Sequence, residues 1–194
     1  IAWPIIYIPT LYPFLLMGTG WVCMKQMSFV QGYVQRMSGK TKGLPWQLLI
    51  AVTMFIALLI DVLVEGMIMM RLGWYAEAGP AITNAGEYYQ LPWRNALLAA
   101  AVFTGLGSLL YFRDDNGNTF FERGVERFAR NSGKSLVLRF LAILAAMQII
   151  MFFCYHIPAA IHEKHFPSHW PESISSKSYF NEHQCGFDTP RPTP

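Results

Sequence analysis

The chain has 194 residues, of which 53% are hydrophobic and only 14% are charged, whereas soluble domains carry about a quarter charged residues. The apolar residues are gathered in continuous runs and not in amphipathic periods, which excludes an ordinary soluble domain and indicates that lipid is the solvent. The formal net charge of +3 comes without a dense block of Lys and Arg, which excludes nucleic acid as a partner.

Residues 1–24 form the first long apolar run. The run is long enough for the ~20 residues that cross a hydrocarbon core, so it predicts a membrane-spanning helix. It begins without the basic flank or cleavage site of a signal peptide, and we therefore expect residue 1 not to be the natural start of the protein. Residues 25–45 contain four bases and no acid, which predicts a cytoplasmic loop by the positive-inside rule.

Residues 46–70 form the second predicted span, and it carries Asp61 and Glu65 in the half nearer the following loop. Residues four apart share a helix face, and an ionisable group in hydrocarbon costs at least a few kcal/mol, so both side chains must face protein or water. Two such carboxyl groups tend to share one proton, which supplies an acid and a base. The alternative is a structural pair neutralised by Arg71, by Arg94 or by a hydroxyl from a neighbouring helix.

Residues 71–92 contain Gly, Pro and many aromatic residues, with no excess of bases, which predicts an extracytoplasmic loop. The loop is either a lid over a substrate or an aromatic belt at the membrane surface. The candidate substrate-binding residues in and beside it are Arg71, Trp74, Tyr75, Glu87, Tyr88, Tyr89 and Arg94. Residues 93–112 are the third predicted span, in which Gly105 and Gly107 would allow close contact between helices.

Residues 113–139 carry six bases and four acids and are predicted to be a cytoplasmic loop. Phe121, Val125 and Phe128 stand at helical spacing, which predicts a short amphipathic helix on the membrane surface. Residues 140–161 are the fourth predicted span, and residues 162–194 are a polar extracytoplasmic tail. The predicted fold is all-α: a polytopic transmembrane bundle of four spans in one helical domain, residues 1–161, followed by the tail.

Histidines and cysteines give weaker signals. His156 lies in an apolar run beside Cys154 and Tyr155, where it is either a satisfied structural residue or a substrate contact. His162, His165 and His169 lack the helical spacing of a zinc motif, so no metal site and no cofactor are predicted. The three cysteines show no spacing typical of a disulfide framework or a zinc site.

Several short sequence segments resemble, in their order along the chain, the spirocyclase AveC family of actinobacterial membrane proteins. They are Asp61–Gly66, Leu72–Gly79, Tyr111–Asp115, Glu122–Gly124, Met151–Pro158, and in the tail Trp170–Glu172, Lys177–Phe180 and His183–Gly186. The resemblance covers nearly the whole chain. It implies a longer protein, with further helices upstream, in the bacterial cell membrane.

The resemblance also implies an activity. The family is associated, in avermectin-type macrolide biosynthesis, with closing a dihydroxyketone into a spiroketal and with a dehydration, and it brings no established catalytic residues with it. Such a closure passes through a hemiketal and an oxocarbenium ion, so it needs an acid and a base, roles that Asp61 and Glu65 would divide. The expected partners are membrane lipid and an apolar polyketide or lipid-like substrate. The alternative is a non-enzymatic lipid-handling or transport-complex component associated with other membrane subunits.

Overall fold

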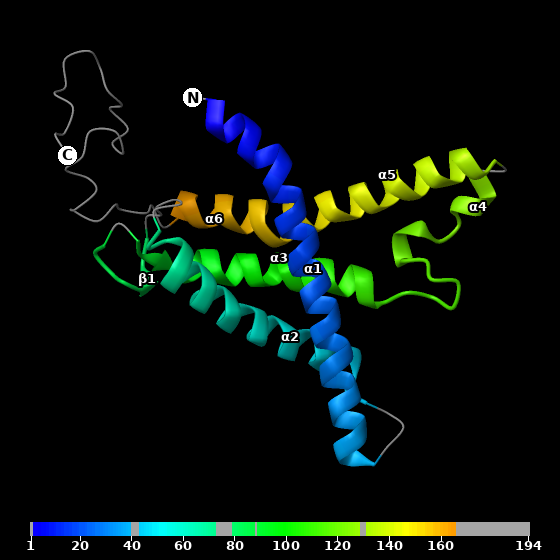
Figure 1. The fold of residues 1–194 in the computed structure, drawn as a ribbon, viewed down its shortest axis with the longest axis horizontal. Coiled ribbons are helices and arrows are strands. Elements are labelled where there is room, and N and C mark those ends of the chain that lie inside the picture. Colours follow the sequence, from blue (N-terminus) through cyan, green and yellow to red (C-terminus); the bar gives the residue numbers. More distant parts are fainter. Residues whose placement is uncertain (1, 40–42, 73–78, 88, 129–130, 166–194) are drawn as a thin grey trace. The chain divides into compact units, whose positions relative to one another are not determined.

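The computed structural model describes residues 2–39, 43–72, 79–87, 89–128 and 131–165. The described chain is mostly helical (Figure 1). It divides into two compact units, one made of residues 1–57 and 99–158 and the other of residues 58–98 and 159–194. The helical domain predicted over residues 1–161 includes residues of both units and stays a prediction.

Among the described residues, three helices are long and apolar enough to cross a membrane: Trp46–Met69, Trp93–Tyr111 and Ser132–His162. They coincide with the second, third and fourth predicted spans. Only 6% of the most apolar part of the last helix is buried within the protein, and large side chains such as Phe140 and Phe153 are exposed on it. Exposed apolar helices of this length indicate a membrane protein, because a helix satisfies its own backbone polar groups where water is absent.

Helix α1, Ala2–Ser38, contains the first predicted span but continues beyond it. Residues 25–38 are helical and not a loop, because bases mark the side of a membrane without disfavouring a helix, and Lys, Arg, Gln and Met are good helix formers. The helix ends before Gly39, whose φ of +60° suits the left-handed position that closes many helices. Helix α1 is not one of the three helices above, so the first of the four predicted spans stays a prediction.

Helix α5, Ser132–Met151, starts eight residues before the predicted span at residue 140. The Asn131 side chain caps its first turn by accepting a hydrogen bond of 3.0 Å from the Gly133 amide. A π-helical turn, η3 (Phe152–His156), joins α5 to α6 (Ile157–His165). The helix therefore extends into the first residues of the predicted tail.

Glycines let α3, Trp93–Tyr111, pack closely in the first unit. A Cβ atom on Gly107 would lie 2.5 Å from the Cβ of Cys23 on α1, and one on Gly105 would lie 2.8 Å from Cγ2 of Ile150 on α5. Both glycines thus mark close helix contacts, as the sequence predicts. Helix α1 also bonds α2 (Trp46–Asp61), because the Gln26 amide donates to the Thr53 carbonyl at 3.3 Å.

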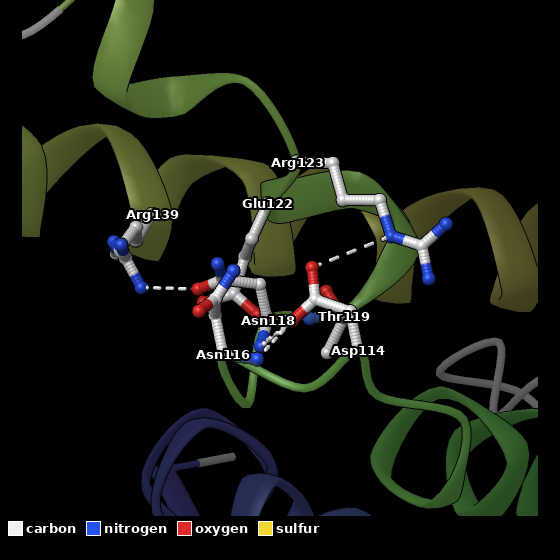
Figure 2. Close-up of polar contacts among 7 residues, drawn as sticks. All are labelled: Asp114, Asn116, Asn118, Thr119, Glu122, Arg123 and Arg139. Atoms are coloured by element: carbon white, nitrogen blue, oxygen red, sulfur yellow. Dashed lines mark hydrogen bonds and ion pairs between the residues drawn. The ribbon is translucent and has the colours of Figure 1, made fainter.

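The residues between α3 and α5 form a structured turn and not one amphipathic helix. A 3₁₀ turn, η2 (Phe120–Glu122), is followed by a single turn of helix, α4 (Val125–Phe128). Gly124 separates them with a φ of +87°, a conformation that breaks the helix. Val125 is buried while Phe120 and Phe128 are exposed, so the predicted amphipathic character persists in two short pieces. Figure 2 shows the turn that precedes them.

The second unit contains a small sheet within the predicted loop 71–92, so this part of the chain is not all-α. Strand β1, Ala81–Thr83, pairs antiparallel with β2, Leu91–Pro92. Asn84 and Gly86 take positive φ values of 55° and 88° where the chain turns between the strands. Leu91 of β2 belongs to an apolar cluster with Met70 and Ala96, against which Leu58, Val62 and Tyr89 pack.

A first prediction concerns Gly107. Gly107→Ala places a methyl group against Cys23 and should lower the free energy of unfolding by about 1–3 kcal/mol through overpacking, measured by thermal unfolding of the detergent-solubilised chain. The matched control is Gly18→Ala on α1, where a Cβ would meet nothing within 4 Å. The control should be neutral or slightly stabilised. Equal stability of the two variants would contradict the close α1–α3 contact.

Candidate functional site

The candidate site is built on a π-helical segment. Helix α2 ends at Asp61 and continues directly as η1, Val62–Met69. In η1 the Met70 amide donates to the Glu65 carbonyl at 2.9 Å, five residues back. Such wide turns are rare and occur frequently at functional sites, because they change which side chains and carbonyls a helix presents.

The two carboxyl groups of this segment are in contact. Asp61 is 7% exposed and Glu65 is half-buried. A side-chain hydrogen bond joins them, and a hydrogen bond between two carboxyl groups needs a proton on one of them. The structure therefore brings the carboxyl groups of the two predicted catalytic residues together.

Helix α3 supplies a third member, Asn95. Its side chain is 8% exposed, and its Nδ2 donates to Oε1 of Glu65 at 3.1 Å. Oδ2 of Asp61, in contrast, is buried and has no hydrogen-bond partner among the described residues. A buried polar atom without a partner costs roughly 1–3 kcal/mol, so it is a candidate for contact with a substrate or a proton.

Sequence reasoning did not single out Asn95. The signal was present, because Asn95 is an amide at the beginning of an apolar span, and polar side chains within spans mark functional or packing sites. The segment Asp61–Gly66 predicts only the acidic pair as the site. The partner helix that contacts the pair depends on the tertiary fold, which periodicity does not report.

The small sheet is held directly on the π-helical segment. A Cβ on Gly66 would lie 2.9 Å from Oγ1 of Thr83 and 3.0 Å from Cδ2 of Leu91, so only glycine allows the sheet to approach this closely. Nδ2 of Asn84 donates to the Gly66 carbonyl at 3.2 Å and to the Tyr89 carbonyl at 3.4 Å. The sheet thus supports the helix at the residue next to Glu65.

The candidate substrate-binding residues have several different surroundings. Arg71 donates to Oδ1 of Asn84 at 3.4 Å, and its guanidinium lies 5.6 Å from the ring centre of Tyr89. Glu87 is exposed in the turn between the strands, where its amide donates to the Asn84 carbonyl. Trp74, Tyr75 and Tyr88 lie outside the described residues.

Arg94 and His162 lie in the second unit, and His156 lies in the first. Nη1 of Arg94 lies 3.2 Å from Nδ1 of His162, and because a guanidinium can only donate, Nδ1 is the acceptor. The rings of Trp93 and His162 also meet edge to face, with 5.8 Å between their centres. These contacts join the start of α3 to α6. His156 belongs to the first unit and contacts the ring of Tyr155.

A family model described as spirocyclase AveC-like matches residues 2–180. The chain belongs to the spirocyclase AveC-like family. The match confirms the resemblance inferred from the sequence, and it includes the acidic pair, Asn95 and the supporting sheet. No curated protein and no solved structure is a match for the chain. Membership of this family of spirocyclases supports a spirocyclase-like role.

The supporting sheet of this AveC-like chain gives a second prediction. Glycine adopts the positive φ of residue 84 readily, but Asn84→Gly removes the side-chain hydrogen bonds to the carbonyls of Gly66 and Tyr89. The change should lower the free energy of unfolding by about 1–2 kcal/mol. Asn116→Gly is the matched control, because Asn116 is exposed. Thermal unfolding followed by tryptophan fluorescence measures both variants. An Asn84→Gly variant as stable as its control would show that the amide does not hold the sheet.

Proposed function

We propose that this protein closes a dihydroxyketone into a spiroketal, with loss of water, by acid–base catalysis at Asp61 and Glu65. The observation that carries the proposal is the hydrogen-bonded carboxyl pair, one member of which has a buried oxygen without a partner among the described residues. Family membership supports the reaction class. The proposed substrate is an apolar polyketide or lipid-like molecule. The proposed location is the bacterial cell membrane, with residues 25–45 and 113–139 on the cytoplasmic side.

In the proposed reaction one substrate hydroxyl first adds to the ketone and forms a hemiketal. The protonated carboxyl, assigned to Asp61, donates its proton to the hemiketal hydroxyl, so the C–O bond breaks and water leaves. The second substrate hydroxyl then attacks the oxocarbenium carbon, and Glu65 takes the proton of that hydroxyl. One water is lost. Asp61 gives up one proton and Glu65 takes up one, so the number of protons on the pair is unchanged.

Asn95 and the contact between the carboxyl groups explain how the pair would work repeatedly. The amide of Asn95 donates to Glu65, which orients the base and supports its negative charge. The Asp61–Glu65 hydrogen bond gives the proton a direct path back to Asp61 after each turnover. Carboxylate charge also stabilises the cationic intermediate, and an apolar setting limits the water that would reopen the ring.

The face of η1 opposite the pair suits a membrane-borne substrate. Leu63, Val64, Met67 and Ile68 are exposed, while Asp61 and Gly66 are buried. An apolar substrate dissolved in lipid would therefore meet an apolar surface on this helix before it reaches the polar groups. The carboxyl groups need no metal or organic cofactor for the proposed steps.

A third prediction tests the pair itself. Asp61→Asn and Glu65→Gln should each slow closure of a synthetic long-chain dihydroxyketone at least about 100-fold, since general acid–base catalysis contributes about 10²–10⁴-fold. Mass spectrometry follows the loss of water from the ketone. Asp115→Asn, an equivalent change at an exposed carboxylate outside the site, should retain full activity. Full activity of both pair variants, or no closure by the unaltered protein, would overturn the proposal.

A fourth prediction concerns Asn95 as a positioning residue. Asn95→Leu removes the amide that holds Glu65 and should lower kcat by about 10–100-fold with a smaller change in KM, because the base loses its orientation. The control is Thr104→Val on the same helix, since Thr104 is buried and its hydroxyl has no partner among the described residues. A raised KM with an unchanged kcat in Asn95→Leu would indicate a role in binding alone.

A further inference from the structure

A basic hollow lies in the first unit, on the turn between α3 and α5. Its volume is about 610 Å³, and its lining is Asp114, Asn116, Asn118, Arg123, Gly124, Arg127 and Arg139. Three guanidinium groups face one carboxylate there, so the lining is net positive. Nothing in the proposed reaction uses this surface.

Internal hydrogen bonds hold the hollow in shape and occupy its single carboxylate. Oδ1 of Asp114 accepts from the amides of Asn116 at 3.0 Å and Asn118 at 2.8 Å. Oδ2 of Asp114 lies 3.7 Å from Nε of Arg123, while Arg139 on α5 donates to Oδ1 of Asn118. Figure 2 shows Arg123 and Arg139 reaching the turn from opposite sides. The turn is therefore a built structure with basic groups on both flanks.

These contacts favour an anion over a cation as ligand. The Asp–Asn turn by itself resembles a cation-binding loop, but the oxygens of Asp114 already accept hydrogen bonds from the turn and face Arg123. The Arg127 side chain is exposed and has no hydrogen bond or ion pair with the residues that the structure describes. Guanidinium groups bind phosphate oxygens through paired N–H donors.

The position of the hollow in the chain points to lipid as the source of that phosphate. Residues 112–131 connect α3 and α5, two helices that are apolar enough to span a membrane, so this connection lies at a membrane surface, at the depth of the headgroups. Phe120 and Phe128 are 70% and 83% exposed, and Arg123 lies over the Phe120 ring at 5.8 Å. Exposed aromatic rings beside basic groups are typical of surfaces that contact lipid.

We propose that this hollow binds the phosphate of an anionic lipid headgroup, with Arg123, Arg127 and Arg139 as its ligands and Phe120 and Phe128 inserted between neighbouring lipids. The bound lipid fixes the α3–α5 connection at the membrane surface. This binding is independent of the carboxyl pair in the second unit.

The test uses the whole chain, purified in neutral detergent and freed of lipid. Native mass spectrometry counts bound lipid while phosphatidylglycerol, phosphatidylcholine or inorganic phosphate is added. We expect phosphatidylglycerol to bind at least about tenfold more tightly than phosphatidylcholine, and Arg127→Gln to weaken it about fivefold, the effect of one basic group near an anionic surface. Arg36→Gln, an equivalent loss of an exposed guanidinium at the end of α1, should bind as the unaltered protein does.

Three outcomes would overturn the proposal. Equal binding of the two lipids would exclude recognition of the anionic headgroup. Unchanged binding in Arg127→Gln would exclude the hollow as the site, and inorganic phosphate that displaces the lipid at equal concentration would exclude lipid as the source. Arg139→Gln is a weaker test because Arg139 also holds Asn118. Circular dichroism of Arg127→Gln checks that its helix content is unchanged.

Discussion

A carboxyl group inside an apolar helix must find polar contacts within the protein, because hydrocarbon offers none. In this chain the constraint applies twice in five residues, at Asp61 and Glu65. Each carboxyl satisfies part of the need of the other, and Asn95 from α3 satisfies a further part. The helices of the second unit are therefore joined by a polar contact that no apolar packing could replace, and the proposed chemistry uses the same contact.

The surrounding elements hold the segment that carries this pair. The sheet lies on Gly66, one residue beyond Glu65, and Asn84 binds the Gly66 carbonyl. Met70 after η1 and Leu91 of the sheet are fully buried in the apolar cluster. A helix that widens into a π-turn loses regular hydrogen bonding, and contacts from outside the helix compensate for part of that loss. The site and its support thus belong to one continuous piece of structure.

Much of the fold could be predicted from apolar periodicity and length. Continuous apolar runs located three spans, and Gly105 and Gly107 marked close helix contacts correctly. Features that depend on local backbone geometry were missed. Bases in residues 25–38 suggested a loop although they are compatible with the helix that forms there, and the regular spacing of Phe121, Val125 and Phe128 concealed the break at Gly124. The strands at Ala81–Thr83 and Leu91–Pro92 are too short to leave a pattern.

The acidic pair could be predicted because an ionisable residue in a span is costly, but its surroundings could not. Asn84 and Asn95 reach the site from segments that are distant in sequence, and only the fold brings them to η1. The π-helical segment itself has a further consequence for this chain. One residue in an α-helix corresponds to about 100° of rotation, so deleting a residue between Asp61 and Gly66 would turn the Asp61 side chain about a quarter turn relative to Gly66, on which the sheet lies. The angle between the Asp61 side chain and the residue that supports the sheet therefore depends on the number of residues between them as well as on their identity.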